Sequence, residues 1–171
     1  MNFFEVLGIV PPKLALDSAD LEKRFYQLSR EWHPDRHGGA IEAVAKSAEI
    51  NGAYRILRDP WKRAGYVLEL YQMKLDSKVP PGLAPLYFEL QEIEDVSNLE
   101  SLRAQLEAEA SKRAELLRET FQKFDQRGIR NFDVSTGELL SDLLSQLRNL
   151  LSEHKYSNSI LRDLTLKMET R

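Results

Sequence analysis

Residues 21–36, LEKRFYQLSREWHPDR, carry the main evidence for the fold. Its apolar side chains recur every three or four residues and fall within one stripe of a helix. They are Leu21, Phe25, Leu28 and Trp32. Asp17 or Ser18 precedes the stripe as a candidate N-cap, and Pro34 ends the helix because the residue before a proline avoids helical angles. The stretch therefore predicts an amphipathic helix with His33 at its exit.

A second helix is predicted after this one, from about Ile41 to Leu57, because apolar residues again share one face. These residues are Ile50, Ala53, Tyr54 and Leu57. The connecting sequence HPDRHGG is too polar and too rich in glycine to pack inside, so we expect an exposed tip between two antiparallel helices. Pro60 then allows a further helix to begin, since proline fits the first turn.

The sequence changes character after DSKVPPGLAP, residues 76–85, which is predicted as a linker. A shorter helix is expected near 86–96, followed by a long amphipathic helix from Asn98 to about Arg127. Ser135 and Glu138 have the spacing of a capping box, which predicts the start of a last helix that contains both Leu139 and Leu140. No strand pattern of comparable length is present. The predicted fold is therefore all-α, with an antiparallel helical hairpin followed by a three-helix bundle.

Composition narrows the classes of protein to consider. The chain has 171 residues, 42% of them apolar and 30% charged, which is ordinary for a folded protein. Its net charge of -3 gives no broad basic field, so we expect no nucleic-acid partner. No apolar run approaches the length of a membrane span, and there is no cysteine. A cytoplasmic protein without membrane attachment is predicted.

An enzyme is not expected. The sequence shows no glycine-rich phosphate loop, no paired catalytic carboxylates and no nucleophile with its base. His33, Asp35 and His37 offer three candidate metal ligands, but a flexible loop without a fourth ligand makes a poor metal site. We therefore predict no metal, no cofactor and no catalytic residue.

Residues 21–36, together with EINGAYRILRDPWKRAGY at 49–66, resemble the J-domain of the DnaJ family over its whole length. NFFEVLGI, residues 2–9, resembles its short first helix, and the basic triplet that begins with Lys62 resembles the start of its fourth. The H-P-D tripeptide of that family is here His33, Pro34 and Asp35. The resemblance implies a J-domain over residues 1–75 that stimulates ATP hydrolysis by a DnaK-type heat-shock chaperone.

The chaperone contact is expected to include a small basic face beside the tip. Lys23 and Arg30 lie roughly opposite the apolar stripe, Arg24 lies nearer its flank, and Arg36 follows the tripeptide. Such charges favour the rate and orientation of association more than its affinity. The alternative is that these side chains are ordinary solvated surface.

The remainder of the chain narrows the type of J-domain protein. It has neither a Gly/Phe-rich linker nor CxxCxGxG zinc modules. The length, the junction RDPWKRAGYVL at 58–68 and the order of helices resemble the HscB type, the J-protein of iron-sulfur cluster assembly. This resemblance implies an HscA-type chaperone and an IscU-type scaffold protein as partners, with residues 86–171 as the client-binding domain. The chain begins at the J-domain, without the cysteine module of some eukaryotic members, so a bacterial source is expected.

The client-binding residues follow from the same resemblance. FELQE, residues 88–92, is similar to the family's Leu-Glu-Leu-Arg-Glu, which implies that Phe88, Glu89 and Glu92 hold the client. Tyr156 resembles the aromatic residue of the client face on the last helix. The sequence departs from the family in the lead-in, where Pro85 is expected to shorten the helix. Phe88 could instead belong to the bundle core.

Two other functions stay open at this point. The chain could be a J-domain co-chaperone for a different client, which the altered lead-in allows. It could also be a helical adaptor in which the J-like hairpin is only structural, although the intact H-P-D tripeptide argues against that.

Overall fold

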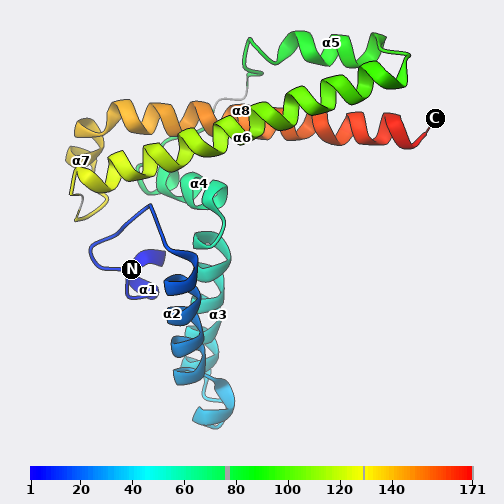
Figure 1. Cartoon of the computed structure of the whole chain (residues 1–171). Coiled ribbons are helices and arrows are strands. Elements are labelled where there is room, and N and C mark those ends of the chain that lie inside the picture. The colour runs from blue at the N-terminus through cyan, green and yellow to red at the C-terminus, as the bar shows by residue number, and fades with distance from the viewer. Residues whose placement is uncertain (76–77, 129, 171) are drawn as a thin grey trace.

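The computed structural model describes residues 1–75, 78–128 and 130–170, and these residues form helices joined by turns, with no strand among them. The predicted all-α class is confirmed. The helices, shown in Figure 1, are α1 (Phe3–Val6), α2 (Ser18–Glu31), the 3-10 helix η1 (Pro34–His37), α3 (Ile41–Leu57), α4 (Pro60–Leu70), α5 (Ala84–Glu92), α6 (Val96–Gln126), α7 (Val134–Leu139) and α8 (Ser141–Glu169).

Helices α2 and α3 form the predicted hairpin, which extends away from the rest of the molecule (Figure 1). Asp17 caps α2 by accepting a hydrogen bond from the backbone of Asp20. The rings of Phe25 and Tyr54 stack between the two helices, with centroids 4.0 Å apart. Phe25 and Trp32 of the predicted apolar stripe are only partly buried and pack against the hydrophobic cluster. No third helix covers the outer part of the hairpin (Figure 1), so its apolar stripe keeps some contact with water.

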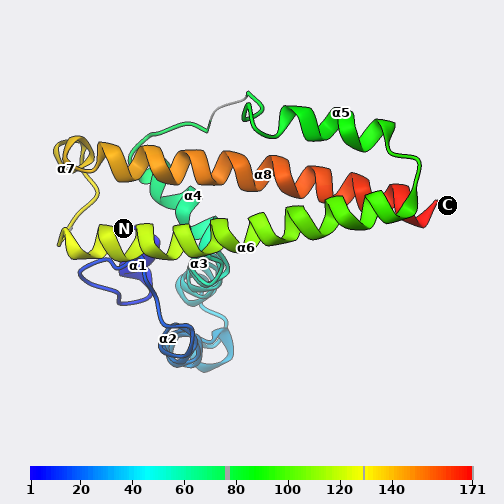
Figure 2. The same cartoon turned by 45° about the horizontal axis from the view of Figure 1, so that its top comes forward.

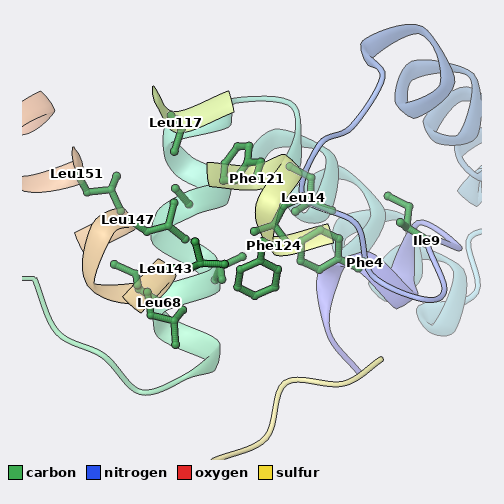
Figure 3. Close-up of a cluster of buried hydrophobic side chains, with 14 of the residues drawn as sticks. Phe4, Ile9, Leu14, Leu68, Leu117, Phe121, Phe124, Leu143, Leu147 and Leu151 are labelled. Atoms are coloured by element: carbon green, nitrogen blue, oxygen red, sulfur yellow. The ribbon is translucent and has the colours of Figure 1, made fainter. Parts of the chain in front are cut away.

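One hydrophobic cluster joins the amino-terminal helices to the bundle (Figure 3). Phe4 and Leu14 from the amino-terminal segment pack with Phe121 and Phe124 of α6. Arg63 of α4 is buried in the same region, where its guanidinium lies 4.9 Å from the Phe121 ring centroid and Nη1 donates to the carbonyl of Leu57. Burial lowers the pKa of Arg63 to about 10. These contacts attach the base of the hairpin to the bundle and leave its tip free.

The bundle consists of the long helices α6 and α8, which run side by side, with α5 packed on their outer side (Figure 2). A second hydrophobic cluster fills this part of the molecule and includes Leu90 of α5, Leu99 and Leu106 of α6, and Ile160 of α8. Lys167 Nζ donates to the carbonyls of Leu90 and Gln91, which ties the end of α5 to α8. The predicted three-helix bundle is present.

The start of the last helix differs from the prediction. The N-cap is Asp133, whose side chain accepts from the backbone and the hydroxyl of Thr136, so α7 begins before Ser135. The predicted single helix is also two helices, because the backbone leaves helical geometry at Leu140. Leu140 is fully buried whereas Leu139 is 76% exposed. The break turns Leu140 into the core, a tertiary preference that periodicity does not reveal.

The short helix of the bundle also differs in its limits. Residues 76–77 of the predicted linker lie outside the described residues, and α5 begins at Ala84 rather than near residue 86. Pro85 lies in the first turn, where the missing N–H would have had no partner in any case. Helix α5 therefore accommodates Pro85 in its first turn. Among the described residues, no helix is long and apolar enough to cross a membrane.

Candidate functional site

The H-P-D tripeptide forms the exposed end of the hairpin. Helix α2 ends at Glu31, and His33 is the N-cap of η1, with Pro34 in its first turn. His33 Nδ1 accepts a hydrogen bond of 3.2 Å from the backbone N–H of Asp35 and lies 3.7 Å from Asp35 Oδ2. The side chains of His33 and Asp35 are 55% and 90% exposed. The tip therefore presents an imidazole and a carboxylate to a partner in a fixed local geometry.

The chain returns to α3 through two glycines. Gly38 and Gly39 have backbone φ angles of +60° and +75°, which residues other than glycine rarely adopt. The backbone N–H of Gly39 also donates to the carbonyl of Pro34 at 2.9 Å. The glycines of HPDRHGG thus allow the tight reversal that the sequence predicted as an exposed tip.

The four cationic residues expected to contact the chaperone occupy different settings. Lys23 and Arg30 are exposed on the outer face of α2. Arg24 is half-buried, with Nε donating to Asp20 at 2.8 Å and Nη1 donating to the carbonyl of Gly8 at 3.0 Å. Its guanidinium ties α2 to the turn after α1, so Arg24 holds the fold in addition to carrying charge. Arg36 is exposed and donates through Nη1 to a carbonyl of α2.

Phe88, Glu89 and Glu92 lie together on the outer surface of the bundle. Phe88 is 69% exposed, and both glutamates are exposed. All three line one open groove at the corner where α5 leads into α6. Because Phe88 is so exposed, the alternative that its ring belongs to the bundle core is wrong. Apolar and acidic side chains line the groove together.

Tyr156 is placed differently from these three residues. It lies on α8, is partly buried and packs against the second hydrophobic cluster, as do Leu86 and Tyr87 of α5. Lys155 Nζ lies 5.6 Å from the centroid of its ring. Tyr156 does not line the groove that contains Phe88. Three of the four predicted client residues therefore line this groove, and Tyr156 does not.

Sequence reasoning missed two acidic residues of the groove. Glu94 and Asp95 line it together with Glu89 and Glu92, and the residues that line it include no cation. The signal was available in the sequence, because EIEDV directly follows FELQ. The groove therefore suits a partner segment that carries both apolar and basic side chains.

The tip and the groove have the features of docking surfaces. Their polar side chains are exposed to water rather than gathered in an enclosed cleft. In the parts of the chain that the structure describes, no group of three or more histidine, cysteine or acidic side chains could hold a metal ion.

Comparison with known proteins identifies the family. The DnaJ domain family matches residues 2–66, the segment that carries the hairpin and its tip. The co-chaperone protein HscB homolog of Vibrio vulnificus (strain YJ016) is 34% identical over 125 residues, which cover 66% of this chain and 72% of that protein. The chain belongs to the HscB co-chaperone family. Co-chaperone protein HscB of Proteus mirabilis is 27% identical over a longer alignment of 163 residues, which covers 88% of this chain and 90% of that protein.

The fold of the HscB family agrees with the structure. The chaperone HscB from Vibrio cholerae superimposes with a TM-score of 0.68 over 99% of both chains, at 23% sequence identity. The predicted resemblance to an HscB-type J-domain protein is confirmed, and so is the expectation of a co-chaperone rather than an enzyme.

Proposed function

We propose that this HscB-type co-chaperone stimulates ATP hydrolysis by a DnaK/HscA-type heat-shock chaperone and delivers an IscU-type scaffold protein to it for iron-sulfur cluster assembly. The observation that carries the first half is the exposed His33–Asp35 tip within the segment that matches the DnaJ domain. The side chain contacts of the two residues leave both free to meet a partner. The chaperone's own ATP site then performs the hydrolysis.

The chaperone-binding surface in this proposal combines the tip with the cationic side chains near it. His33, Pro34 and Asp35 form the end of the surface, and the exposed Lys23 and Arg30 extend it along α2. The positive charges speed the approach of an acidic surface, whereas the tip determines whether the bound partner responds. Arg24 and Arg36 add charge, although their donors already bind backbone carbonyls.

The client-binding surface in this proposal is the groove around Phe88. Exposed aromatic side chains are frequent anchors of protein interfaces, and the glutamates around the ring favour a basic partner segment. Tyr156 supports the surface from the adjoining cluster of α5 and α8. We propose residues 1–75 as the J-domain, 76–85 as the linker and 86–171 as the client-binding domain, acting in the cytoplasm.

The test is the ATP turnover of a purified DnaK/HscA-type chaperone with and without this protein, and then with an IscU-type scaffold added. We expect the wild type to stimulate ATP turnover by the chaperone and the His33→Gln variant not to stimulate it. The side chain of His33 is exposed, so the variant should melt at the wild-type temperature. A well-folded His33→Gln protein that still stimulates the chaperone contradicts the J-domain role. Stimulation without any effect of the scaffold favours a J-domain co-chaperone for a different client.

A further inference from the structure

The end of α2 is closed by side chains that come from beyond the H-P-D tripeptide. The last carbonyls of a helix lack partners within it and need other donors. The carbonyl of Arg30 accepts from Arg36 Nη1 at 3.0 Å, and the carbonyl of Glu31 accepts from His37 Nε2 at 2.8 Å. Because a carbonyl only accepts, Nε2 of His37 carries the proton. Both contacts reach back across the tripeptide.

The ring of His37 also packs against α2. Its centroid lies 5.6 Å from the centroid of Trp32, and the two planes are inclined by only 15°. The backbone N–H of Trp32 donates to the carbonyl of Leu28 at 2.9 Å, and its ring packs partly buried against the hydrophobic cluster. His37 is thus held by a hydrogen bond and by a ring contact, on two successive residues.

These contacts enclose the tripeptide between two anchored ends. Trp32 precedes His33, and His37 follows Asp35 by two residues. The stacking of His37 on Trp32 therefore closes a short loop that contains the tripeptide. Within the loop, the Asp35 N–H bonds to His33 Nδ1. A loop closed in this way has few conformations to lose when a partner binds.

We infer that His37 is a positioning residue of the chaperone-binding tip, which holds His33, Pro34 and Asp35 in their binding geometry through the Glu31 carbonyl and the Trp32 ring. The inference rests on the proposed function of the tip. His37 acts before binding: it raises the fraction of free molecules whose tip is ready to bind. If that fraction falls, the apparent affinity for the chaperone falls by the same factor, whereas the bound complex stays the same.

This role predicts a specific split between two kinetic quantities. In His37→Ala, the concentration of co-chaperone that gives half-maximal stimulation should rise about fivefold to 150-fold, the range expected for losing one hydrogen bond and one ring contact. The maximal stimulation should stay at the wild-type value. His33→Gln should show the opposite pattern, with the maximum lost, because that residue meets the partner.

Two further variants separate the contacts. His37→Phe keeps a ring for Trp32 but has no donor for the Glu31 carbonyl, and should recover part of the loss. His37→Gln keeps a donor without the ring, and should also recover part. All three variants should melt at the wild-type temperature, since His37 is exposed and its contacts with Glu31 and Trp32 lie at the far end of the hairpin.

The outcomes distinguish this inference from the proposed function. If the wild type does not stimulate the chaperone, the proposed function fails. If the wild type stimulates and His37→Ala has the same half-maximal concentration, the positioning role is wrong. A fall in maximal stimulation would instead make His37 a direct contact, and melting several degrees below the wild type would make it part of the global fold. Either result overturns the inference.

Discussion

The indole ring of Trp61 lies flat against the imidazole ring of His154, with centroids 3.8 Å apart and planes inclined by 7°. Trp61 is in the first turn of α4 and His154 is on α8, so the pair joins the amino-terminal helices to the bundle. Burial lowers the pKa of His154, and the nearby Arg113 lowers it further, while Asp59 acts in the opposite direction. The folded protein therefore favours the neutral imidazole.

The first prediction concerns the pH dependence of stability. An unfolded histidine titrates near pH 6.5, about the usual value. Because the pKa of His154 is lower in the folded state, the unfolded chain binds its proton first as pH falls. The stabilisation by neutral His154 should be complete above about pH 7.5 and decline through pH 6.5 until the folded pKa is passed. Thermal melts at successive pH values should show this decline, and His154→Gln should show a smaller one.

The control is a variant that exposes His154 without removing it. Trp61→Ala uncovers the imidazole, so the pKa of His154 should rise toward its usual value and the decline should diminish as in His154→Gln. Equal declines in the wild type and His154→Gln would show that other groups determine the acid sensitivity.

The second prediction concerns Asp125, which joins α6 to the segment before α2. Its two carboxylate oxygens accept hydrogen bonds from the backbone of Leu14 at 2.7 Å and Ala15 at 2.9 Å. Hydrogen bonds to a charged group are worth about 1.5–3 kcal/mol each, less where water reaches them. Asp125→Ala should lower the free energy of unfolding by about 1–3 kcal/mol in denaturant titrations.

A matched control is available at Asp142. This aspartate binds Arg127 through two hydrogen bonds of 2.9 and 2.7 Å, but both side chains are exposed. Exposed ion pairs contribute little to stability because water and salt screen them. Asp142→Ala should therefore change the denaturation midpoint much less than Asp125→Ala. Equal effects would show that the Leu14 and Ala15 contacts add nothing beyond surface charge.

Local pattern was sufficient to predict the hairpin and its tip. The limits predicted for the second helix, Ile41 to Leu57, are those of α3, and the N-cap Asp17 was one of two expected residues. Helical periodicity, caps and the positions of glycine and proline all act over a few residues. The exposure of His33 followed from the same local signals, because a polar, glycine-rich turn cannot be buried.

The features that sequence reasoning missed depend on contacts between distant residues. Arg24 reaches Gly8, sixteen positions away, and Asp125 reaches Leu14, more than one hundred positions away. No spacing rule connects such pairs. The break at Leu140 has a similar origin, because burial of that side chain decides where α7 ends. The sequence indicates His37 only as a poor candidate metal ligand, and no local pattern predicts that its ring stacks on Trp32.

The third prediction distinguishes cationic residues of α2 that speed association with the chaperone, Lys23 and Arg30, from Arg24, which also stabilises the fold. Lys23→Ala and Arg30→Ala should slow association with the chaperone at low salt. The difference from the wild type should shrink at physiological salt, where the Debye length is about 8 Å. Arg24→Ala should affect stability more than the two others, since it loses the Asp20 and Gly8 contacts. Stopped-flow association and thermal melts measure the two effects. Association rates that do not depend on salt would identify the basic face as ordinary surface.

The last prediction concerns the client face, where exposure separates Phe88 from Tyr156. Phe88 is 69% exposed, so Phe88→Ala should have the melting temperature of the wild type. As an interface anchor its loss should cost about 2 kcal/mol or more of binding to an IscU-type scaffold, close to thirtyfold in Kd by calorimetry. Glu89→Gln and Glu92→Gln should weaken binding mainly at low salt. In all three variants, basal stimulation of the chaperone should survive because the tip is distant.

Tyr156 provides the contrast that makes this result informative. Its partly buried ring packs against the second cluster, so Tyr156→Ala should lower the melting temperature, whereas Tyr156→Phe keeps the ring and should not. Weaker scaffold binding by Tyr156→Ala therefore counts as evidence for a contact only if Tyr156→Phe, at wild-type stability, also binds more weakly. If Phe88→Ala and Tyr156→Phe both bind the scaffold with wild-type affinity, the groove is not the client face. The chain would then be an HscB-type co-chaperone whose tip drives the chaperone but whose client binds elsewhere.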